Sequence, residues 1–298
     1  MRLLNYYKHL FALSGIILIL GVVSLTVFGL EQGIDFKGGT VTELAFNQSF
    51  DQEKVKTVLS EVGINNFQLQ PTGENGLIIK TESIDKATHD KISEGIKTQV
   101  GEYTEKRFDS IGPTVGADLK KKALYQLIIV SLGIIIYIAY AFRKVSRPIT
   151  PLQFGLAAII ALVHDLLIVL GIFSILGHFY GIEIDSLFVT AMLTVLGFSV
   201  HDTIIVFDRI RENLRVYAGQ STEFIINHSI SQTLVRSLNT SLTVLFVLLA
   251  MLLFGGETIR YFVLALFIGV AAGTYSSIFV AAPILVIWQN YRNRKLKR

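Results

Sequence analysis

Cysteine is absent from this 298-residue chain, which excludes disulfide bonds, cysteine-ligated metals and a thiol nucleophile. Charged residues are also scarce, at 17%, whereas apolar residues make up 51% and the mean hydropathy is +0.54. That balance is too apolar for an ordinary soluble chain, so a simple cytosolic enzyme is disfavoured. No Gly-rich phosphate loop is present either, and we therefore expect no direct ATP hydrolysis.

Six long apolar runs account for the excess of hydrophobic residues. Most are close to the roughly 20 residues that cross a bilayer as a helix. We therefore predict a polytopic α-helical membrane protein with six transmembrane helices, at Leu10–Leu30, Ala123–Phe142, Leu152–Leu176, Leu187–Phe207, Leu238–Phe254 and Tyr261–Trp288. The first run exceeds the roughly 7–15 apolar residues of a signal peptide, and we interpret it as a retained anchor.

Basic residues gather on one side of these predicted spans. They precede the first span, separate the second from the third, follow the fourth and end the chain: Arg2, Lys8, Arg143, Lys144, Arg147, Arg209, Arg211, Arg215, Arg292, Arg294, Lys295, Lys297 and Arg298. Because cytoplasmic loops are enriched in Lys and Arg, we expect both termini in the cytoplasm. The same segments are suited to contact with anionic lipid headgroups.

One long polar stretch separates the first two spans, and this orientation places it outside the cytoplasm. Its patterns predict strands and helices in the order βαββαβ, at Thr40–Phe46, Gln52–Val62, Phe67–Gln70, Leu77–Lys80, Ile84–Val100 and Tyr103–Ile111. That order is typical of a ferredoxin-like α+β domain. We expect docking or substrate contact there, not catalysis, with His89 as a solvated surface residue.

The predicted organisation therefore has four segments. They are the tail and first helix at 1–30, an extracytoplasmic α+β domain at 31–122, helices two to six at 123–288, and a basic cytoplasmic tail at 289–298.

Glycine-rich motifs stand at both ends of the polar domain. Their residues of interest are Gly33, Asp35, Phe36, Gly38 and Gly39 before it, and Gly112, Pro113 and Gly116 after it. Turn chemistry is the simpler interpretation, because Gly permits positive φ and Pro fixes φ. The functional alternative is a pair of hinges through which the membrane part moves the domain.

Two carboxylates lie inside the predicted spans. Asp165 is flanked by His164 in the third, and Asp202 is flanked by His201 in the fourth. A carboxylate at the centre of a span costs about 2.5–3.5 kcal/mol, so each is expected to face protein or water and is a functional candidate. Neighbours on a helix diverge by about 100°, so the two members of each pair face different surroundings.

The start of the fifth span carries Arg236, a natural counter-charge and hydrogen-bonding partner for Asp202. Burial favours the protonated form of a carboxyl group, whereas a nearby cation favours its ionised form. A modest rearrangement would therefore let the group take or lose a proton. The candidate proton relay comprises Asp202, Arg236, Asp165, His201, His164, Thr203 and Asn239. The alternative is a static hydrogen-bonded clasp between helices. The spacing of these residues does not predict a metal site, and we expect no cofactor.

Small residues recur every four positions in the sixth span. They are Ala265, Gly269, Gly273, Ser277 and Ala281, and such a stripe lets another helix approach closely. The pattern leaves open whether that helix belongs to this chain or to another.

Several of these segments, in this order, resemble the SecF family of bacterial protein-export membrane proteins. The resemblance rests on the two glycine motifs, on Leu162-Val-His-Asp165, on the stretch Leu196–Asn213 and on Arg236-Ser-Leu-Asn-Thr-Ser241. Many members have Asn where this chain has His201, which leaves open an extra titratable group or a packing role for that side chain.

The resemblance implies a place in the bacterial inner membrane and kinship with resistance–nodulation–division transporters. It implies pairing with SecD and work with SecYEG, SecA and, in addition, YajC and YidC, on unfolded preproteins. The proton or sodium gradient would drive late, ATP-independent translocation, with Asp202 and Arg236 carrying the coupling. No nucleic-acid partner and no enzymatic activity are expected.

Three alternatives remain open at this point. An intramembrane aspartyl protease would require a Gly-x-Gly-Asp type motif, which the residues before Asp202 lack. Half of a proton-driven exporter of small molecules or lipids would copurify as a homodimer or with an adaptor. A passive scaffold would keep its activity when Asp202 is changed to Asn.

Overall fold

The computed structural model describes residues 7–143 and 148–296, and it divides into two compact units. One unit combines Met1–Glu31 with Tyr125–Arg298, and the other is Gln32–Leu124. Among the basic residues that predict the orientation, Arg2, Lys144, Arg147, Lys297 and Arg298 lie outside the described residues, as do the side chains of Lys8, Arg294 and Lys295.

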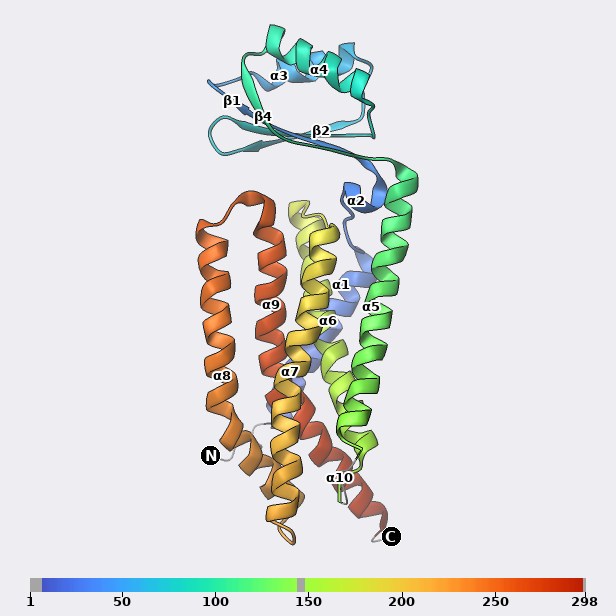
Figure 1. Ribbon diagram of the computed structural model, residues 1–298, viewed down its shortest axis with the longest axis vertical. Helices are drawn as coiled ribbons and strands as arrows, with labels where there is room; N and C mark the ends of the chain where they lie inside the picture. The colour runs from blue at the N-terminus through green and yellow to red at the C-terminus, as the bar shows by residue number, and fades with distance from the viewer. Residues whose placement is uncertain (1–6, 144–147, 297–298) are drawn as a thin grey trace. The chain divides into compact units, whose positions relative to one another are not determined.

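The smaller unit is an α+β domain (Figure 1). Its elements are α2 Ile34–Lys37, β1 Gly39–Phe46, α3 Gln52–Glu61, β2 Phe67–Thr72, β3 Gly76–Thr81, α4 Lys86–Gln99 and β4 Tyr103–Ile111. All strand pairs are antiparallel and the sheet order is β2-β3-β1-β4. That order agrees with the ferredoxin-like arrangement expected from the βαββαβ pattern.

Helices α3 and α4 cover one face of this sheet, and apolar side chains from both layers form the core between them (Figure 1). Leu44, Leu77, Val55, Leu59 and Ile96 are each no more than 1% exposed. The alternation that predicts the strands arises because one sheet face is buried in this way.

His89 differs from the expectation of a solvated side chain. Its ring lies 3.9 Å from the Phe108 ring, centroid to centroid, and its Nε2 lies 2.8 Å from Glu105 Oε2. Only 16% of the side chain is exposed. The residues next to His89 in the sequence are polar and suggest a solvated side chain. The ring packs instead against β4, which supplies both Phe108 and Glu105.

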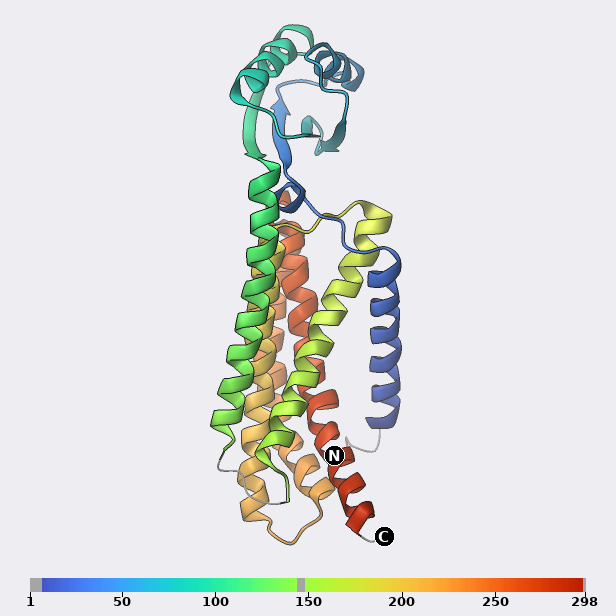
Figure 2. The same ribbon diagram turned by 90° about the vertical axis from the view of Figure 1, so that its right-hand side faces the viewer.

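The larger unit is helical (Figures 1 and 2). Its elements, with α5 shared across the boundary between the units, are α1 Tyr7–Val27, α5 Pro113–Ala141, α6 Pro151–Tyr180, α7 Ser186–Val216, α8 Thr222–Phe254, the 3-10 turn η2 Glu257–Ile259, α9 Arg260–Ser276, the π-helix η3 Ser277–Ala281 and α10 Ala282–Leu296. Among the described residues, six helical stretches are long and apolar enough to span a membrane. The predicted fold class is therefore confirmed.

Several helices extend well beyond their apolar runs. Helix α5 begins at Pro113 instead of Ala123, α7 continues to Val216, and α8 begins at Thr222. Hydropathy follows the contact with lipid, whereas a helix continues until its backbone hydrogen bonds end. The Ser221 hydroxyl caps α8 by accepting a hydrogen bond from the Phe224 N–H at 3.2 Å.

The sixth span is not the regular helix that the apolar run predicts. It consists of α9, the π-helix η3 and α10. Pro283 follows η3, and a proline has no N–H to bond to the carbonyl four residues earlier and crowds that carbonyl. The wider π turn relieves this conflict, and such segments often lie at functional sites.

A candidate ion-coupling site in the helical unit

Asp165 of α6 is held at the junction of three helices. It is 1% exposed and accepts hydrogen bonds on Oδ2 from Ser199 of α7 at 2.5 Å and from Ser276 of α9 at 2.7 Å. Its Oδ1 lies 2.9 Å from Nδ1 of His164. Both carboxylate oxygens therefore have partners.

His164 extends this network to α1. Because a carboxylate oxygen only accepts, Nδ1 is the nitrogen that donates to Asp165 when that group is ionised. The other ring nitrogen, Nε2, lies 2.8 Å from Ser14 Oγ. The two members of the pair thus face different helices, as their positions predict, yet they also contact each other.

Asp202 of α7 is surrounded differently. It is 0% exposed, and its Oδ2 accepts one hydrogen bond, from Ser241 of α8 at 3.2 Å. Thr274 of α9 donates in turn to Ser241 at 2.7 Å. Within the described part of the chain, Oδ1 of Asp202 has no hydrogen-bond partner. A buried polar atom without a partner is costly, and native structures seldom leave one unexplained.

Helix α9 and the π-helix that follows contribute to both carboxylate environments. Thr274 reaches Asp202 through Ser241, and Ser276 bonds Asp165 directly. Ser277 lies 2.9 Å from Oγ1 of Thr203, which is buried on α7. A shift of this segment would therefore change the surroundings of both acids together.

The remaining relay candidates lie outside this cluster. His201, Arg236 and Asn239 are all exposed. No hydrogen bond or ion pair joins Arg236 to Asp202 in residues 7–143 and 148–296, where the donor to Asp202 is the hydroxyl of Ser241. Our expectation of Arg236 as the direct counter-charge of Asp202 is therefore not met within the chain.

Sequence reasoning missed the hydroxyl groups that complete the network. Ser14, Thr274 and Ser276 are buried among apolar neighbours, and nothing in their own helices distinguishes them from the many serines and threonines that bond back to their helix backbone. Only their position in the sequence could have identified them, because Thr274 and Ser276 lie next to residues of the small-residue stripe.

The partner of that stripe is α7 of the same chain. A Cβ built on Gly269 would lie 2.2 Å from Val195 Cγ2, and one on Gly273 would lie 3.0 Å from Ser199 Cβ. The stripe therefore brings α9 close enough to α7 for the serines to reach Asp165. Ala265, Ser277 and Ala281 are also fully buried.

The two glycine motifs pack against each other within the α+β unit. Gly38 and Gly39 have φ of +79° and +142°, and a Cβ on Gly38 would lie 2.8 Å from Pro113 Cα. A Cβ on Gly116 would lie 2.9 Å from the nitrogen of Gly38 and 3.2 Å from the carbonyl carbon of Phe36. Close backbone approach thus gives these glycines a packing role in addition to turn formation.

Other members of the motifs occupy the same joint. Gly33 caps the short helix α2, Phe36 is 7% exposed, and Asp35 lies in the first turn of α2. A Cβ on Gly112 would meet no atom within 4 Å, so that glycine does not share in the close contact. Elsewhere, in the described ranges, no group of three His, Asp or Glu side chains could hold a metal ion.

Comparison with known proteins decides the family. Residues 91–291 match the family model "Protein export membrane protein SecD/SecF, C-terminal", and residues 23–49 match the family model "SecD/SecF GG Motif". The chain belongs to the SecD/SecF family. The first match contains both buried carboxylates, and the second contains Gly38 and Gly39.

Relatives in this family cover most of the chain. The protein translocase subunit SecF of Thermobaculum terrenum is 49% identical, over 94% of this chain and 91% of its own length. That of Anaerolinea thermophila is 43% identical, with the same two coverages. The crystal structure of SecDF from Thermus thermophilus, titled a translocon-associated membrane protein, matches with a TM-score of 0.83 and 30% identity. That match covers 97% of this chain but 39% of the longer SecDF chain.

Proposed function

We propose that this chain is the SecF subunit of a bacterial protein-export machinery, and that it uses an ion gradient to assist late, ATP-independent movement of preproteins. SecF relatives matched over nearly the whole chain support the export role. The observation that carries the coupling is Asp202, which is fully buried with one carboxylate oxygen lacking a partner among the described residues.

The contrast with Asp165 supports this assignment. Asp165 has hydrogen-bond partners on both oxygens from three neighbouring groups, so a further ligand would have to displace one of them. At Asp202 a proton, a water molecule or a monovalent cation would satisfy Oδ1 without breaking an existing bond. Asp202 is therefore the exchanging group, and Asp165 is the fixed centre that ties α6 to α7 and α9.

Arg236 then acts with a second subunit. An exposed guanidinium on a membrane helix cannot face hydrocarbon at low cost, so it requires a polar or acidic partner. Asn239 lies on the same exposed side, and His201 is exposed on α7. A SecD-like half would cover this face and supply the counter-charge. The match to part of a SecDF chain supports such pairing.

The same proposal specifies the membrane, the orientation and the neighbouring proteins of the chain. It spans the bacterial inner membrane with both termini in the cytoplasm, so the α+β domain lies outside and contacts the emerging preprotein. The glycine motifs at its base form the hinge through which the helices move it. SecYEG and SecA supply the channel and the earlier, ATP-driven step, with YajC and YidC as further neighbours.

Complementation tests the export role. A bacterium depleted of its own SecF would receive this chain together with the SecD of the same source. We expect preprotein to stop accumulating and growth to recover. Accumulation equal to that of the empty vector, with the chain present in the membrane at normal amounts, would contradict the proposal.

A further inference from the structure

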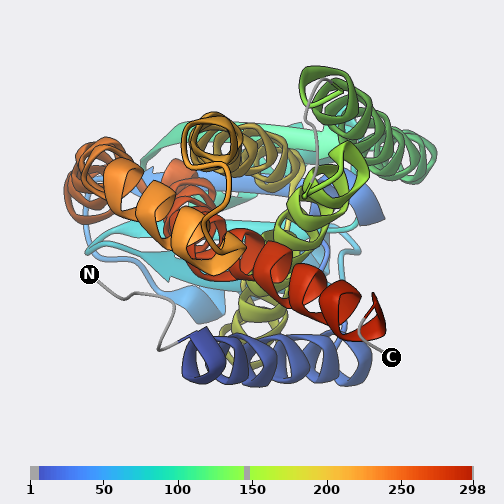
Figure 3. The same ribbon diagram turned by 90° about the horizontal axis from the view of Figure 1, so that it is seen from below.

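Helices α1 and α6 run in the same direction and meet in a constant register. Ser14 Oγ of α1 lies 2.8 Å from Nε2 of His164 on α6, and the Ser24 hydroxyl donates to Ser174 Oγ at 2.9 Å. Both pairs are 150 positions apart in the sequence. Figure 3 shows α1 along one edge of the helical unit, with α10 crossing nearby. The parallel register holds Ser14 against the imidazole of His164.

The imidazole of His164 has a partner on each ring nitrogen. Nδ1 lies 2.9 Å from Asp165 Oδ1, and Nε2 faces Ser14. The other oxygen of Asp165 accepts hydrogen bonds from Ser199 and Ser276, so three groups hold the carboxylate. Since an ionised carboxylate only accepts, the ring hydrogen belongs on Nδ1. Nε2 is therefore the ring atom that can gain or lose a proton.

Ser14 suits both states of Nε2, because a hydroxyl donates as well as accepts. It donates to the bare nitrogen of a neutral ring and accepts from the N–H of a protonated one. In the second state its hydrogen turns to the carbonyl of Leu10, four residues earlier on α1, which is a usual acceptor for a helical serine. That carbonyl accepts one bond already, from the Tyr275 hydroxyl of α9 at 2.9 Å, and has a second lone pair. His164 can thus take a proton without loss of a hydrogen bond in the network.

Asp165 balances the charge of a protonated His164. The two side chains are 1% and 2% exposed, and buried charges require an opposite charge in contact. Their closest atoms, Asp165 Oδ1 and His164 Nδ1, are the hydrogen-bonded pair already described. Both states of the ring are therefore compatible with burial.

Titratable groups on the helices packed around α6 face elsewhere, with one exception. Tyr275 of α9 has its ring 6.3 Å from that of His164, centroid to centroid. The others described on these helices bond elsewhere or are exposed, among them His9 of α1, Asp202 and His201 of α7, and Arg292 of α10. Asp165 is thus the counter-charge of His164 among the described side chains.

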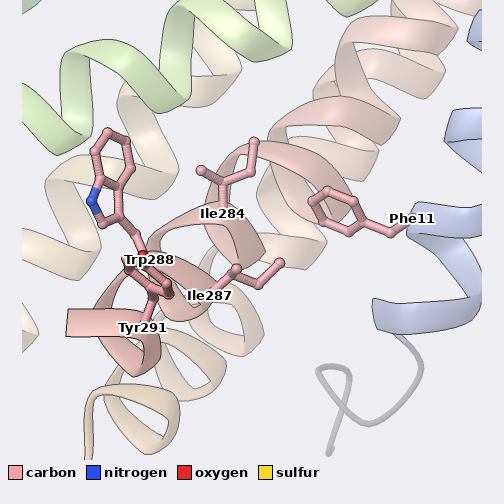
Figure 4. Close-up of a pocket in the computed structure, with 5 residues that line it drawn as sticks. All are labelled: Phe11, Ile284, Ile287, Trp288 and Tyr291. Atoms are coloured by element: carbon pink, nitrogen blue, oxygen red, sulfur yellow. The ribbon is translucent and has the colours of Figure 1, made fainter. Parts of the chain in front are cut away.

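A cavity of about 330 Å³ reaches the bond between Ser14 and His164. Both side chains line it, and the rest of its lining is apolar. Figure 4 shows Phe11, one turn before Ser14, pointing across a neighbouring gap toward Ile284 of α10. The volume exceeds the roughly 10–15 Å³ that a water molecule needs, and the two polar groups are suited to bind one. Water can therefore bring a proton to Nε2 from this side.

We propose that His164 is a proton-binding site, with Nδ1 held by ionised Asp165 and Nε2 as the exchanging atom. A hydronium ion in the cavity gives its proton to the lone pair of Nε2 and becomes water, while the Ser14 hydrogen turns from Nε2 to the Leu10 carbonyl. The bond between α1 and α6 reverses its direction, and Asp165 keeps its three partners. The site requires neither the export role nor the exchange proposed for Asp202, so its test measures protonation, not translocation.

Solid-state NMR of the full chain, reconstituted with its SecD partner and labelled with ¹⁵N in its histidine rings, tests the site. Signals of His164 are assigned by their loss in His164→Gln. As the pH is lowered from about 8 to about 5, the range in which histidine commonly changes charge, we expect a neutral ring with hydrogen on Nδ1 to become protonated on both nitrogens. A neutral ring with hydrogen on Nε2, or one unchanged state across the range, would overturn the proposal.

Two serines of α1 provide matched variants. Ser14→Ala removes the partner of Nε2 and should shift the Nε2 signal of both states. Ser24→Ala removes a buried hydroxyl that bonds Ser174 on the same pair of helices, and it should leave the His164 signals unchanged. Ser14→Thr keeps the hydroxyl and should restore the original signals, which also covers the case in which Ser14→Ala does not fold. Equal effects of Ser14→Ala and Ser24→Ala, or none from Ser14→Ala in a folded protein, would contradict the role of Ser14.

Discussion

At the scale of single residues, the two buried acids differ in how completely the chain satisfies them. Asp165 has partners on both oxygens, whereas Asp202 has one donor and one oxygen without a partner among the described residues. We propose that the same residue type serves two purposes in these neighbouring helices, with Asp165 as a structural carboxylate and Asp202 as the exchanging one.

A residue outside the spans gives a pH-dependent prediction. Asp85 caps α4, and hydrogen bonds from the side chain and backbone N–H of Thr88 hold the pKa of Asp85 below its usual value. A carboxyl group whose pKa is lower in the folded state than in the unfolded state stabilises the fold at any pH above its ordinary, unfolded pKa. This stabilisation is lost as the pH falls through the lowered pKa. We expect Asp85→Ala to lower the unfolding temperature of the α+β domain at pH 7.

The same comparison, repeated as pH falls through the lowered pKa of Asp85, is its internal control. As the carboxyl becomes protonated, its advantage over Ala should shrink. A difference between the two proteins that stays constant across this range, followed by circular dichroism, would show that ionisation of Asp85 contributes nothing.

At the scale of elements, α9 and η3 organise the site. The glycines of α9 admit α7, the hydroxyls of Thr274 and Ser276 reach both acids, and the π turn accommodates Pro283. This one segment therefore links helix packing to the chemistry of the carboxylates.

Substitution of a packing glycine tests this role. A Cβ on Gly269 would lie 2.2 Å from Val195 Cγ2, and Val is stiff at χ1, so α7 and α9 must separate. We expect Gly269→Ala to lower the free energy of unfolding in detergent by about 1–3 kcal/mol. Gly133→Ala, where nothing lies within 4 Å, is the matched control. Equal stabilities of the two variants would contradict the packing account.

The helices and strands could be predicted from the sequence more completely than the hydrogen bonds around Asp165 and Asp202. Long apolar runs and strict alternation gave the six spans and the βαββαβ order, because burial in lipid or in a sheet core imposes those periods. Apolar runs did not predict the polar extensions of α7 and α8 or the π-helix, because hydropathy does not register backbone hydrogen bonds. Asp165 and Asp202 were identifiable as buried charges, but their partners Ser276 and Ser241 come from other helices, and only tertiary packing brings them close.

At the scale of the whole molecule, the exposed polar side chains on α7 and α8 imply a second membrane subunit. Arg236, Asn239 and His201 are exposed although they lie on helices able to span a bilayer. Contact of such groups with lipid is expensive. We therefore propose that these residues form an interface with a SecD-like half.

Site-specific photo-cross-linking tests this interface. A benzoylphenylalanine at Asn239 should cross-link to coexpressed SecD. The same group at Val22 of α1, which is 42% exposed, should label lipid instead. Cross-linking to SecD from Val22 but not from Asn239 would place the partner on the opposite side and leave Arg236 without its counter-charge.

The most direct test of ion coupling is preprotein completion in inverted vesicles after ATP is exhausted, with and without an ion gradient. Asp202→Asn is compared with wild type and with Asp208→Asn, an acid on the same helix that is exposed and paired with Arg211 at 2.5 Å. We predict that the gradient speeds completion in wild type and Asp208→Asn but not in Asp202→Asn. An equal response in all three would contradict the account, because Asp202 would then be a packing residue.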